Sequence, residues 1–542
     1  MEQNNNSKNL ILFIIIAMLI LLGWNWMFPP PAIEQQPTDK NVQATQNSTA
    51  TSNSEKVESS LATGQLVAVK TDVMNLNIDM QSGDIRDLVL TRYNATSDEK
   101  KPFVLFENKP NKVYVAQSGL LDANNQYIFA PFTTPKTQYQ MNGDVLTVRL
   151  NSKLDNQVEI DKIYTFTKGS YVIGVNYEVR NNSNEPLKLS AMYRLLRDDS
   201  TPEGESRFAY TYTGPVMYTP EGNFEKVDFS DIAKNKAEYT KSSNSGWVGM
   251  IQHYFAAAWI LQTKNDNSVC GNSGNCIFDF SKRNKDNLYS AGVIVPVKDI
   301  AVGKNAIIPM TLYAGPQEYS SITKVANHLE LVKDYGKVHV FAAPLFWLLQ
   351  KLHKLVGNWG WAIILLVILV KIVLYPLNAT AYKSMAKMRA VAPKLQALKI
   401  QYGDDRMKMQ QEMMALYKKE KISPLGGCIP MLIQIPVFLG LYWALLSSVE
   451  LRQAPWIGWI TDLARTDPYF ILPLVMAGTM FLQTYLSPPP PDPMQAKMMK
   501  IIPIVFSVMF FFFPAGLVLY WVVNNILSIA QQWFINKQIE QH

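Results

Sequence analysis

The sequence predicts a membrane protein of two parts, a large all-β domain and an all-α core of transmembrane helices. Three observations lead to this prediction. Hydrophobic residues make up 48% of the 542 residues and charged residues only 18%, which is unusual for a soluble protein of this length. The long apolar runs are unevenly placed, since one covers residues 10–28 and the others follow residue 355. Between them the sequence has the composition of an ordinary soluble domain.

The N-terminal run is predicted to be a retained membrane anchor. Residues 1–9 contain Lys8 and precede the apolar stretch 10–28 in the manner of a signal peptide. No small-x-small cleavage pattern follows, because Trp24 and other bulky residues stand there. The N-terminus is therefore expected in the cytoplasm. Residues 29–62 consist largely of Gln, Asn, Ser, Thr and Pro, which predicts a flexible tether on the far side of the membrane.

Residues 63–335 are predicted to form a β-sandwich of two large sheets, a super-sandwich, on the far side of the membrane. Stretches such as "KIYTFTKGSYVIGVNYEVRNNS" contain β-branched and aromatic residues at a period of two. Turn signals such as Gly83-Asp84 separate these stretches. Many short strands punctuated by turns are typical of a sandwich.

Cys270 and Cys276 are candidates for a disulfide within this domain. The five residues between them are Gly, Asn and Ser, which form turns that bring two Cα atoms within bonding range. An oxidising compartment would favour the bond, and the alternative is two unpaired thiols. Cys428 lies in an apolar run and is expected to be an inert small hydrophobe.

Residues 336–356 are predicted to form an amphipathic helix that lies in the outer membrane interface. Leu, Phe and Trp share one face of "KVHVFAAPLFWLLQKLHKLVG", and Lys and His lie elsewhere. The alternative is a helix packed on the β domain.

Residues 357–542 are predicted to hold five spans, which with the anchor make six transmembrane helices and place both termini in the cytoplasm. The expected spans are 358–377, 427–447, 469–486, 499–513 and 516–535. Charge supports this topology, because residues 378–424 contain ten Lys or Arg and residues 448–466 only two. Residues 337–542 hold nineteen Lys or Arg against nine Asp or Glu. This excess of positive charge is explained by membrane topology and does not indicate DNA binding. Contact with ribosomal RNA is the one nucleic-acid interaction that is considered.

The loop 378–424 is expected to be a helical hairpin in the cytoplasm. Two helical stretches are separated by Gly403-Asp404-Asp405, and Asp404 is placed to cap the second. Methionines are concentrated here and their flexible apolar side chains suit varied hydrophobic partners, although packing between the two helices is the alternative. They are Met385, Met388, Met407, Met409, Met413 and Met414.

Several classes of enzyme leave no trace in the sequence. It contains no G-x-x-x-x-G-K-[ST] phosphate loop, no H-E-x-x-H and no G-x-S-x-G, so no nucleotide motor, zinc protease or hydrolase is indicated. No histidine pairs with a second ligand at metal spacing, and His253 is most simply a core or strand residue. No cofactor or metal is expected.

Lys371 is the strongest anomaly, because it lies inside the predicted span 358–377. Burying it against lipid would cost roughly 3 kcal/mol, so a polar cavity is favoured over the alternative, a side chain that extends to the inner headgroups. The neighbours of Lys371 one helical turn away are apolar, so polar lining must come from other spans. The candidates are Gln434, Thr479, Gln483, Asn524 and Asn525, for which interhelical hydrogen bonds are the alternative role.

The C-terminal half resembles the YidC/Oxa/Alb family of membrane protein insertases, in its long Gram-negative form. The resemblance rests on "YPLNATAYKSMAKMRAVAPKLQALK", "GGCIPMLIQIPVFLGLYWAL", "PWIGWITDLARTDPYFILPLVMAGTMFLQ" and "FPAGLVLYWVVNNILSIAQQ". It implies five spans around a hydrophilic groove that is open to cytoplasm and lipid and closed on the outer side. A positive residue there, Lys371, would attract the acidic tail of a client. The implied function is insertion and chaperoning of inner-membrane proteins, alone or with the Sec translocon, without enzymatic activity.

Three departures from the family pattern bear on these expectations. The family commonly has arginine where this chain has Lys371, and lysine lacks the planar fork of arginine. Many relatives have a second tyrosine after Tyr520, where this chain has Trp521, so the client contact implied at this pair would be more apolar. The tail "NKQIEQH" has one lysine, which leaves the basic hairpin to meet a ribosome.

Two other functions are weighed against this one. A secondary transporter or channel would use Lys371 as its substrate or ion site, but the five spans show no internal repeat. A carbohydrate-processing β domain would need a pair of carboxylates in a cleft. Acidic residues such as Asp198 and Asp199 are better explained as solvated loop charges.

Overall fold

The computed structural model contains a β domain and a helical region that follows it in the chain. It describes residues 61–95, 100–110, 112–202, 211–270, 275–283, 287–333, 335–402, 405–420, 429–486, 501, 503–505 and 507–540. The predicted anchor 10–28 and nearly all of the tether 29–62 lie outside the described residues, as do Asp404 and Cys428.

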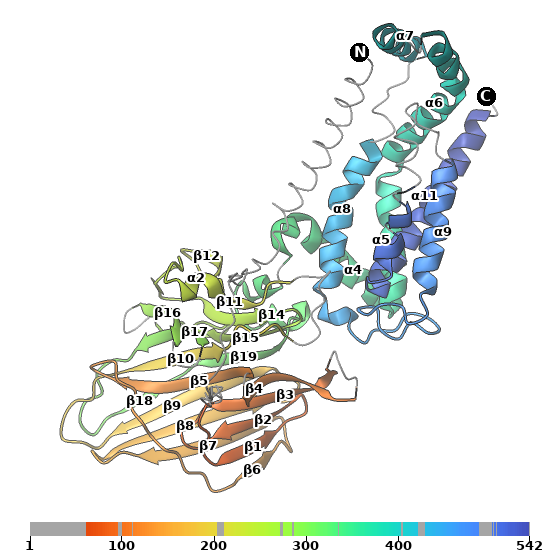
Figure 1. Ribbon diagram of the computed structural model, residues 1–542. Helices are drawn as coiled ribbons and strands as arrows, with labels where there is room; N and C mark the ends of the chain where they lie inside the picture. Colours follow the sequence, from red (N-terminus) through yellow and green to blue (C-terminus); the bar gives the residue numbers. More distant parts are fainter. Residues whose placement is uncertain are drawn as a thin grey trace, which may run out of the picture. The chain divides into compact units, whose positions relative to one another are not determined.

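The β domain contains two large sheets, as predicted (Figure 1). The ten-stranded sheet consists, in spatial order, of β13 (Ser242–Ser243), β16 (Cys276–Arg283), β17 (Leu288–Pro296), β10 (Leu189–Arg197), β5 (Lys112–Asp122), β4 (Pro102–Lys109), β3 (Ile85–Asn94), β2 (Met74–Asp79), β1 (Leu66–Lys70) and β6 (Gln138–Gln140). Its described pairings are antiparallel except that β6 pairs parallel with β1.

The second sheet has nine strands. Their order is β12 (Asn223–Lys226), β11 (Gly214–Thr219), β14 (Trp247–Gln252), β15 (Phe255–Ile260), β19 (Thr311–Pro316), β9 (Val172–Asn181), β8 (Val158–Thr167) and β7 (Val145–Lys153), with β18 (Asn305–Ile308) paired to β9. Strand β9 shows the period-two pattern clearly, since its residues alternate between buried and half-buried along the whole strand.

The two sheets are packed face to face around one hydrophobic core. The core draws buried residues from both sheets, among them Leu88 and Phe106 from one and Val175 and Trp259 from the other. The rings of Tyr193 and Trp259 lie 5.2 Å apart across the interface. This arrangement is that of a sandwich. The short helix α2 (Phe229–Ala233) lies between β12 and β13 in sequence, and α3 (Tyr319–Ile322), η1 (Leu329–Val332) and η2 (Gly336–Val338) follow the last strand.

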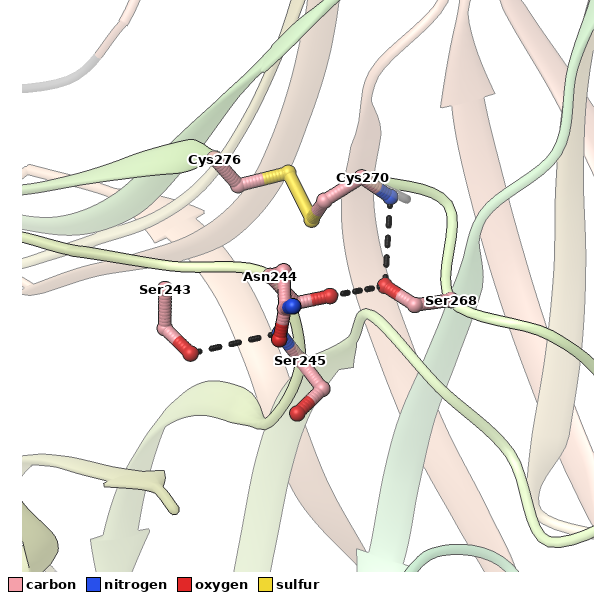
Figure 2. Close-up of a disulfide and its surroundings, with 6 residues drawn as sticks. All are labelled: Ser243, Asn244, Ser245, Ser268, Cys270 and Cys276. Atoms are coloured by element: carbon pink, nitrogen blue, oxygen red, sulfur yellow. Dashed lines mark hydrogen bonds between the residues drawn. A yellow bond between two sulfur atoms is a disulfide. The ribbon is translucent and has the colours of Figure 1, made fainter. Parts of the chain in front are cut away.

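Cys270 and Cys276 are joined by a disulfide, with their Cα atoms 5.5 Å apart (Figure 2). Both cysteines are fully buried. The hydroxyl of Ser268 donates a hydrogen bond to the Asn244 carbonyl and accepts one from the Cys270 amide. The disulfide therefore closes the loop before β16 onto the first residue of that strand. The hydrogen bond from Ser268 to Asn244 holds the same loop beside the end of β13, which pairs with β16 at the edge of the sheet.

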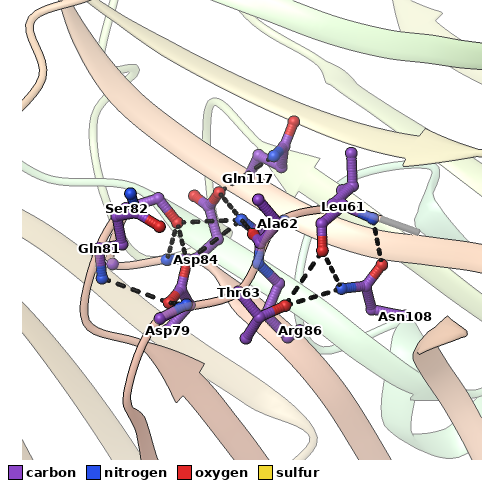
Figure 3. Close-up of polar contacts among 12 residues, drawn as sticks. Leu61, Ala62, Thr63, Asp79, Gln81, Ser82, Asp84, Arg86, Asn108 and Gln117 are labelled. Atoms are coloured by element: carbon purple, nitrogen blue, oxygen red, sulfur yellow. Dashed lines mark hydrogen bonds and ion pairs between the residues drawn. The ribbon is translucent and has the colours of Figure 1, made fainter. Parts of the chain in front are cut away.

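A buried polar cluster fixes the point at which the chain enters the β domain (Figure 3). Asp79 accepts hydrogen bonds from the Gly64 amide and the Ser82 hydroxyl and forms an ion pair with Arg86 at 3.2 Å. Burial alone would raise the pKa of Asp79, but these hydrogen bonds and the Arg86 charge hold it below its ordinary value. Arg86 also donates to the Ala62 carbonyl.

Lys162 lies in the same part of the β domain and is completely buried. Its ammonium group donates to the Ser118 carbonyl at 3.1 Å and lies 4.0 Å from the Asp84 carboxylate. Burial lowers the pKa of Lys162 to about 8, although the Asp84 charge opposes this shift.

Helix α4 (His339–Val356) packs on the helical region and not on the β domain alone. Its residues Ala342, Phe346 and Leu349 are buried, and it contacts α8 (Ile429–Leu446) and α5 (Trp359–Val373). The opposite face is exposed and apolar, as at Trp347 and Leu355. This exposed face suits the predicted position in the membrane interface.

Helix α5 ends earlier than the predicted span 358–377. It stops at Val373, and α6 (Tyr375–Tyr402) continues in a new direction, since the segment Tyr375–Ser384 is bent by 66° from α5. Pro376 explains the break, because its ring would clash with the carbonyl of Ile372 and it lacks an N–H. Lys371 lies two residues before the end of α5.

The hairpin consists of the far part of α6 and α7 (Arg406–Lys419), which extend beyond the other helices in Figure 1. The cap of α7 is Asp405, which accepts a hydrogen bond from the Lys408 amide at 3.0 Å. The prediction of Asp404 as the cap was wrong by one residue. Either aspartate offers the same carboxylate, and the sequence pattern alone does not fix the first turn.

The remaining described helices are α8, η3 (Val449–Leu451), α9 (Ile471–Leu486) and α11 (Ala515–Glu540). Among the described residues, no single helix has both the length and the apolarity of a complete membrane span. The bent pair Trp359–Val373 and Tyr375–Ser384 meets both conditions together, and Gln434–Leu446 and Ile471–Leu486 are shorter apolar helices. Parts of the predicted spans 427–447 and 499–513 lie outside the described residues.

Candidate functional site

Lys371 lies in a buried polar cluster between three helices. Its side chain is only 6% exposed, and its ammonium group donates a hydrogen bond to the Ser528 hydroxyl of α11 at 2.7 Å. The Ser528 hydroxyl donates in turn to the Asn524 carbonyl one turn earlier. In the part of the chain that the structure describes, no carboxylate lies within 4 Å of the Lys371 ammonium group. A buried cation without a counterion depends on such hydrogen bonds.

The cluster reaches α8 through Asn524. The Asn524 side chain accepts a hydrogen bond from Gln434 Nε2 at 2.5 Å, and Gln434 is also a partner of the Tyr520 hydroxyl. We call Lys371, Gln434, Asn524 and Ser528 the α11 polar cluster. Three of the residues predicted from the sequence thus meet in space, although Lys371 and Gln434 come from different helices.

A second polar contact joins α11 to α9. The Asn525 side chain donates to the Thr479 hydroxyl at 3.2 Å, and Thr479 donates to the Met476 carbonyl. Gln483 is half-buried one turn further along α9. Asn524 and Asn525 are adjacent, so they face different neighbours, and this contact is separate from the α11 polar cluster.

Tyr520 and Trp521 belong to an aromatic group near the N-terminus of α11. The Trp521 ring lies 4.8 Å from Phe438 of α8 and 5.6 Å from Phe510. Tyr520 is buried, whereas Trp521 is half-buried. Because Tyr520 and Trp521 precede Asn524 by about one turn, this group adjoins the α11 polar cluster on the side of the helix N-terminus.

The loop between α8 and α9 closes the ends of α5 and α11. We call residues 447–470 the outer loop. Asn358 caps α5 and donates to the Pro455 and Trp456 carbonyls, and Trp456 lies against Gly360, where a Cβ would approach it within 2.1 Å. The Leu463 carbonyl accepts from the Gly516 amide, the first turn of α11. The loop therefore satisfies helix-end groups that would otherwise lack partners.

The predicted methionines of the hairpin occupy different environments. Met413 packs with Val391 and Tyr417 in a small core between α6 and α7. Met407 and Met414 are 78% and 45% exposed and lie seven residues apart, on one face of α7. Met409 is half-buried. The side chains of Met385 and Met388 lie outside the described part of the structure.

Two residues near Lys371 were missed from the sequence. Ser528 is the direct partner of the ammonium group, and Tyr382 of α6 also hydrogen-bonds to Ser528. A signal for Ser528 existed, because it follows Asn524 by four residues and so lies on the same face of α11. Tyr382 had no such signal, since its approach depends on the bend at Leu374.

Other residues weighed from the sequence have structural roles. Asp198 accepts hydrogen bonds from the Val113 and Ser200 amides, and Asp199 is exposed. His253 lies in the turn between β14 and β15, with its Nε2 3.0 Å from the Leu446 carbonyl, and burial lowers its pKa to about 4. Neither arrangement is that of a catalytic pair.

Family models match almost the whole chain. The model described as 60Kd inner membrane protein matches residues 351–542, and the model described as YidC periplasmic domain matches residues 66–348. Membrane protein insertase YidC of Neisseria meningitidis serogroup C is 57% identical to this chain, and the alignment covers 98% of each protein. Membrane protein insertase YidC of Laribacter hongkongensis is 52% identical, with 99% of this chain and 98% of the relative covered.

One solved structure aligns over nearly the full length. It is described as an active YidC insertase with the first transmembrane domain resolved, and it covers 96% of this chain and 98% of its own. Its sequence identity is 16% and its TM-score is 0.39.

Proposed function

Because the chain belongs to the YidC family of membrane protein insertases, we propose that it inserts client proteins into the bacterial inner membrane and assists their folding. The family is one of insertases and not of enzymes, so no bond of the client is made or broken. The chain is a membrane protein with a periplasmic domain. The observation that carries the mechanism is the buried ammonium group of Lys371 with a hydroxyl partner and no described counterion.

This ammonium group would be the first contact of an acidic client segment. A hydroxyl is a weaker partner for a cation than a carboxylate, because the carboxylate adds the attraction of a full negative charge to the hydrogen bond. A client carboxylate would therefore displace Ser528 from Lys371. Ser528 keeps a second partner in the Asn524 carbonyl, so the exchange leaves its own donor satisfied.

Transfer of the client to lipid needs no nucleotide. Apolar segments gain about 25 cal/mol per Å² when they leave water, so a spanning helix supplies a large driving force of its own. The protein would lower the barrier by offering polar groups at the depth where the hydrophilic end of the client must cross. We propose that Gln434, Thr479, Gln483, Asn524 and Asn525 line this hydrophilic groove with Lys371, next to the client contact at Tyr520 and Trp521.

The proposed topology has six transmembrane helices, with both termini and the hairpin in the cytoplasm. The basic residues of 378–424 support this orientation. On the hairpin, Met407 and Met414 present exposed apolar side chains to hydrophobic clients. Its lysines and arginines would meet a ribosome during synthesis, and larger clients would need the Sec translocon as a partner.

The test is insertion of a small client with one or two spans into proteoliposomes that contain only the purified protein. We expect protease-protected client at a level well above that in protein-free liposomes. Equal protection of the client in proteoliposomes and in protein-free liposomes would contradict the proposal. Liposomes with an unrelated membrane protein at the same density serve as a control for bilayer disturbance.

A further inference from the structure

The outer loop makes a set of contacts with the β domain that the insertion mechanism above does not use. They begin at the end of α8, where His253 approaches the Leu446 carbonyl at 3.0 Å. Leu446 is the last residue of α8, and carbonyls at this position have no partner within the helix. A residue of the β domain thus caps a helix of the core.

Arg452 makes the second contact. Its guanidinium group donates to the Asn94 carbonyl at the end of β3. It also lies 5.5 to 5.6 Å from the ring centres of Phe103, Tyr254 and Phe255, all in the β domain. An arginine held by a carbonyl and by aromatic faces has a defined position, because both interactions depend on direction.

Glu450 makes the third contact. Its carboxylate forms an ion pair with Lys333 at 2.7 Å and accepts a hydrogen bond from the Tyr319 amide. The Lys333 side chain is fully buried, and its ammonium group lies 3.7 Å from the ring centre of Phe346 in α4. Burial lowers the pKa of Lys333, and the Glu450 charge opposes this shift. Removing one partner of such a pair leaves an uncompensated buried charge.

The opposite side of the outer loop holds the helices. Leu463 is completely buried among Ile363, Leu366 and Val518, and its carbonyl and that of Arg465 accept from the first amides of α11. The loop is therefore bound on one side to the β domain and on the other to the ends of α5 and α11.

We propose that the β domain is a brace for the outer loop and that Arg452 and Glu450 are positioning residues that keep the outer ends of α5, α8 and α11 closed. The brace gives the β domain a role in insertion, since a client attracted to Lys371 could then leave toward lipid but not through the outer end. This last consequence rests on the proposed insertase function, whereas the closure itself does not.

The test measures closure by the reactivity of a buried cysteine. Val518→Cys places a thiol in a fully buried position one turn into α11, and Ile535→Cys places one in a buried position near the opposite end of the same helix. Both are made with Cys428→Ser, and the disulfide of Cys270 and Cys276 does not react. The full-length protein in nanodiscs is treated with a hydrophilic maleimide.

We expect Arg452→Ala and Glu450→Ala each to raise the labelling rate of Val518→Cys at least 10-fold and to leave that of Ile535→Cys unchanged. Arg452→Lys keeps the cation but not the planar group that faces the three rings, so it should restore only part of the protection. Arg92→Ala is the control, because Arg92 is an exposed arginine of the β domain that pairs with Asp72. An unchanged rate at Val518→Cys in folded Arg452→Ala and Glu450→Ala would overturn the brace, as would an equal rise at both reporters.

Two further variants keep the test decisive if Arg452→Ala fails to fold. Lys333→Met alone leaves Glu450 unpaired and should raise labelling at Val518→Cys, whereas Lys333→Met with Glu450→Gln removes both charges and should raise it less. Equal labelling in the single and double variants would contradict a role for the pair. Insertion is measured in parallel on the parent, so a failure of the proposed function is seen without any change in the labelling result.

Discussion

Replacing Lys371 by methionine removes the charge of the α11 polar cluster while keeping an unbranched side chain that is one atom shorter. The change loses one charge-assisted hydrogen bond to Ser528, worth about 1.5–3 kcal/mol. It also removes the cost of burying a cation that is 6% exposed, which is several kcal/mol. These effects oppose each other, so we expect the free energy of unfolding to change by no more than about 2 kcal/mol.

Insertion should respond much more strongly than stability. Two unit charges about 6 Å apart interact by about 3 kcal/mol at an effective dielectric constant of about 20. If Lys371 attracts a client carboxylate at this range, Lys371→Met should slow insertion of an acidic client by up to about 100-fold. Lys371→Arg keeps the charge and the donors and should insert at a rate close to that of the parent.

The assay combines the residue at position 371 with the charge of the client. Parent, Lys371→Met and Lys371→Arg are each reconstituted in proteoliposomes and given a client with an acidic tail and the same client with Asn and Gln in place of the acids. Rates are taken from protease protection over time. For the parent, removing the acids from the client should lower the insertion rate about as much as Lys371→Met does. For Lys371→Met, removing the acids should lower the insertion rate little further.

Full activity of Lys371→Met toward the acidic client would refute the electrostatic role. Lys371 would then be a buried structural residue, and insertion would depend on shape and apolar contact. Equal losses for acidic and neutral clients would also refute it, because a charge effect must depend on the charge of the client.

Three other predictions concern the β domain and the hairpin. Replacing Cys270 and Cys276 by serine should lower the free energy of unfolding of the full-length protein by about 2 kcal/mol, because the disulfide closes a short loop with a sequence separation of 6; denaturant titration measures this, and an unchanged midpoint would contradict it. Burial lowers the pKa of Lys162 from 10.5 to about 8, so below pH 8 the native and unfolded states are both protonated. Between about pH 8 and pH 10.5 only the unfolded state keeps the proton, and the parent should gain up to about 3 kcal/mol over Lys162→Met, a difference that comparative unfolding across this range would detect or exclude. In the hairpin, Met414→Ser should weaken crosslinking to a client without loss of stability, because this side chain is exposed. Met413→Ser should destabilise the hairpin by about 1–3 kcal/mol, which protease sensitivity would show. If Met413→Ser weakened crosslinking and Met414→Ser did not, the exposed side chain would have no client role.

The sequence predicted the elements of the β domain better than their arrangement. Period-two patterns marked strands such as β9, because alternation follows directly from burial of one face. The order of the strands is set by pairings between distant segments, such as β10 with β5 and β15 with β19, and no local pattern encodes them. The parallel pairing of β6 with β1 is a further contact of this kind.

The helical region shows the same division. Lys371 was evident from the sequence because a charge in an apolar run that is predicted to span a membrane is costly, and the polar residues of other helices were evident for the same reason. The end of α5 was misplaced by four residues, since hydropathy continues through Pro376 although the helix cannot. The outer loop has no regular pattern, so its contacts through Arg452 and Glu450 were visible only in three dimensions.

The polar residues of α11 explain how one helix can serve both as a structural centre and as a site. Asn524 and Ser528 lie on the face toward α5 and α8, whereas Asn525 donates to Thr479 of α9 and Gln532 donates to the Leu486 carbonyl at the end of α9. Seven residues separate Asn525 from Gln532, so these two form one stripe along the helix. The stripe toward α9 is uncharged on both sides and suits permanent packing. The stripe toward α5 meets Lys371, a cation with a hydroxyl partner and, among the described residues, no carboxylate within 4 Å. A cation held in this way is one that a carboxylate from outside can capture.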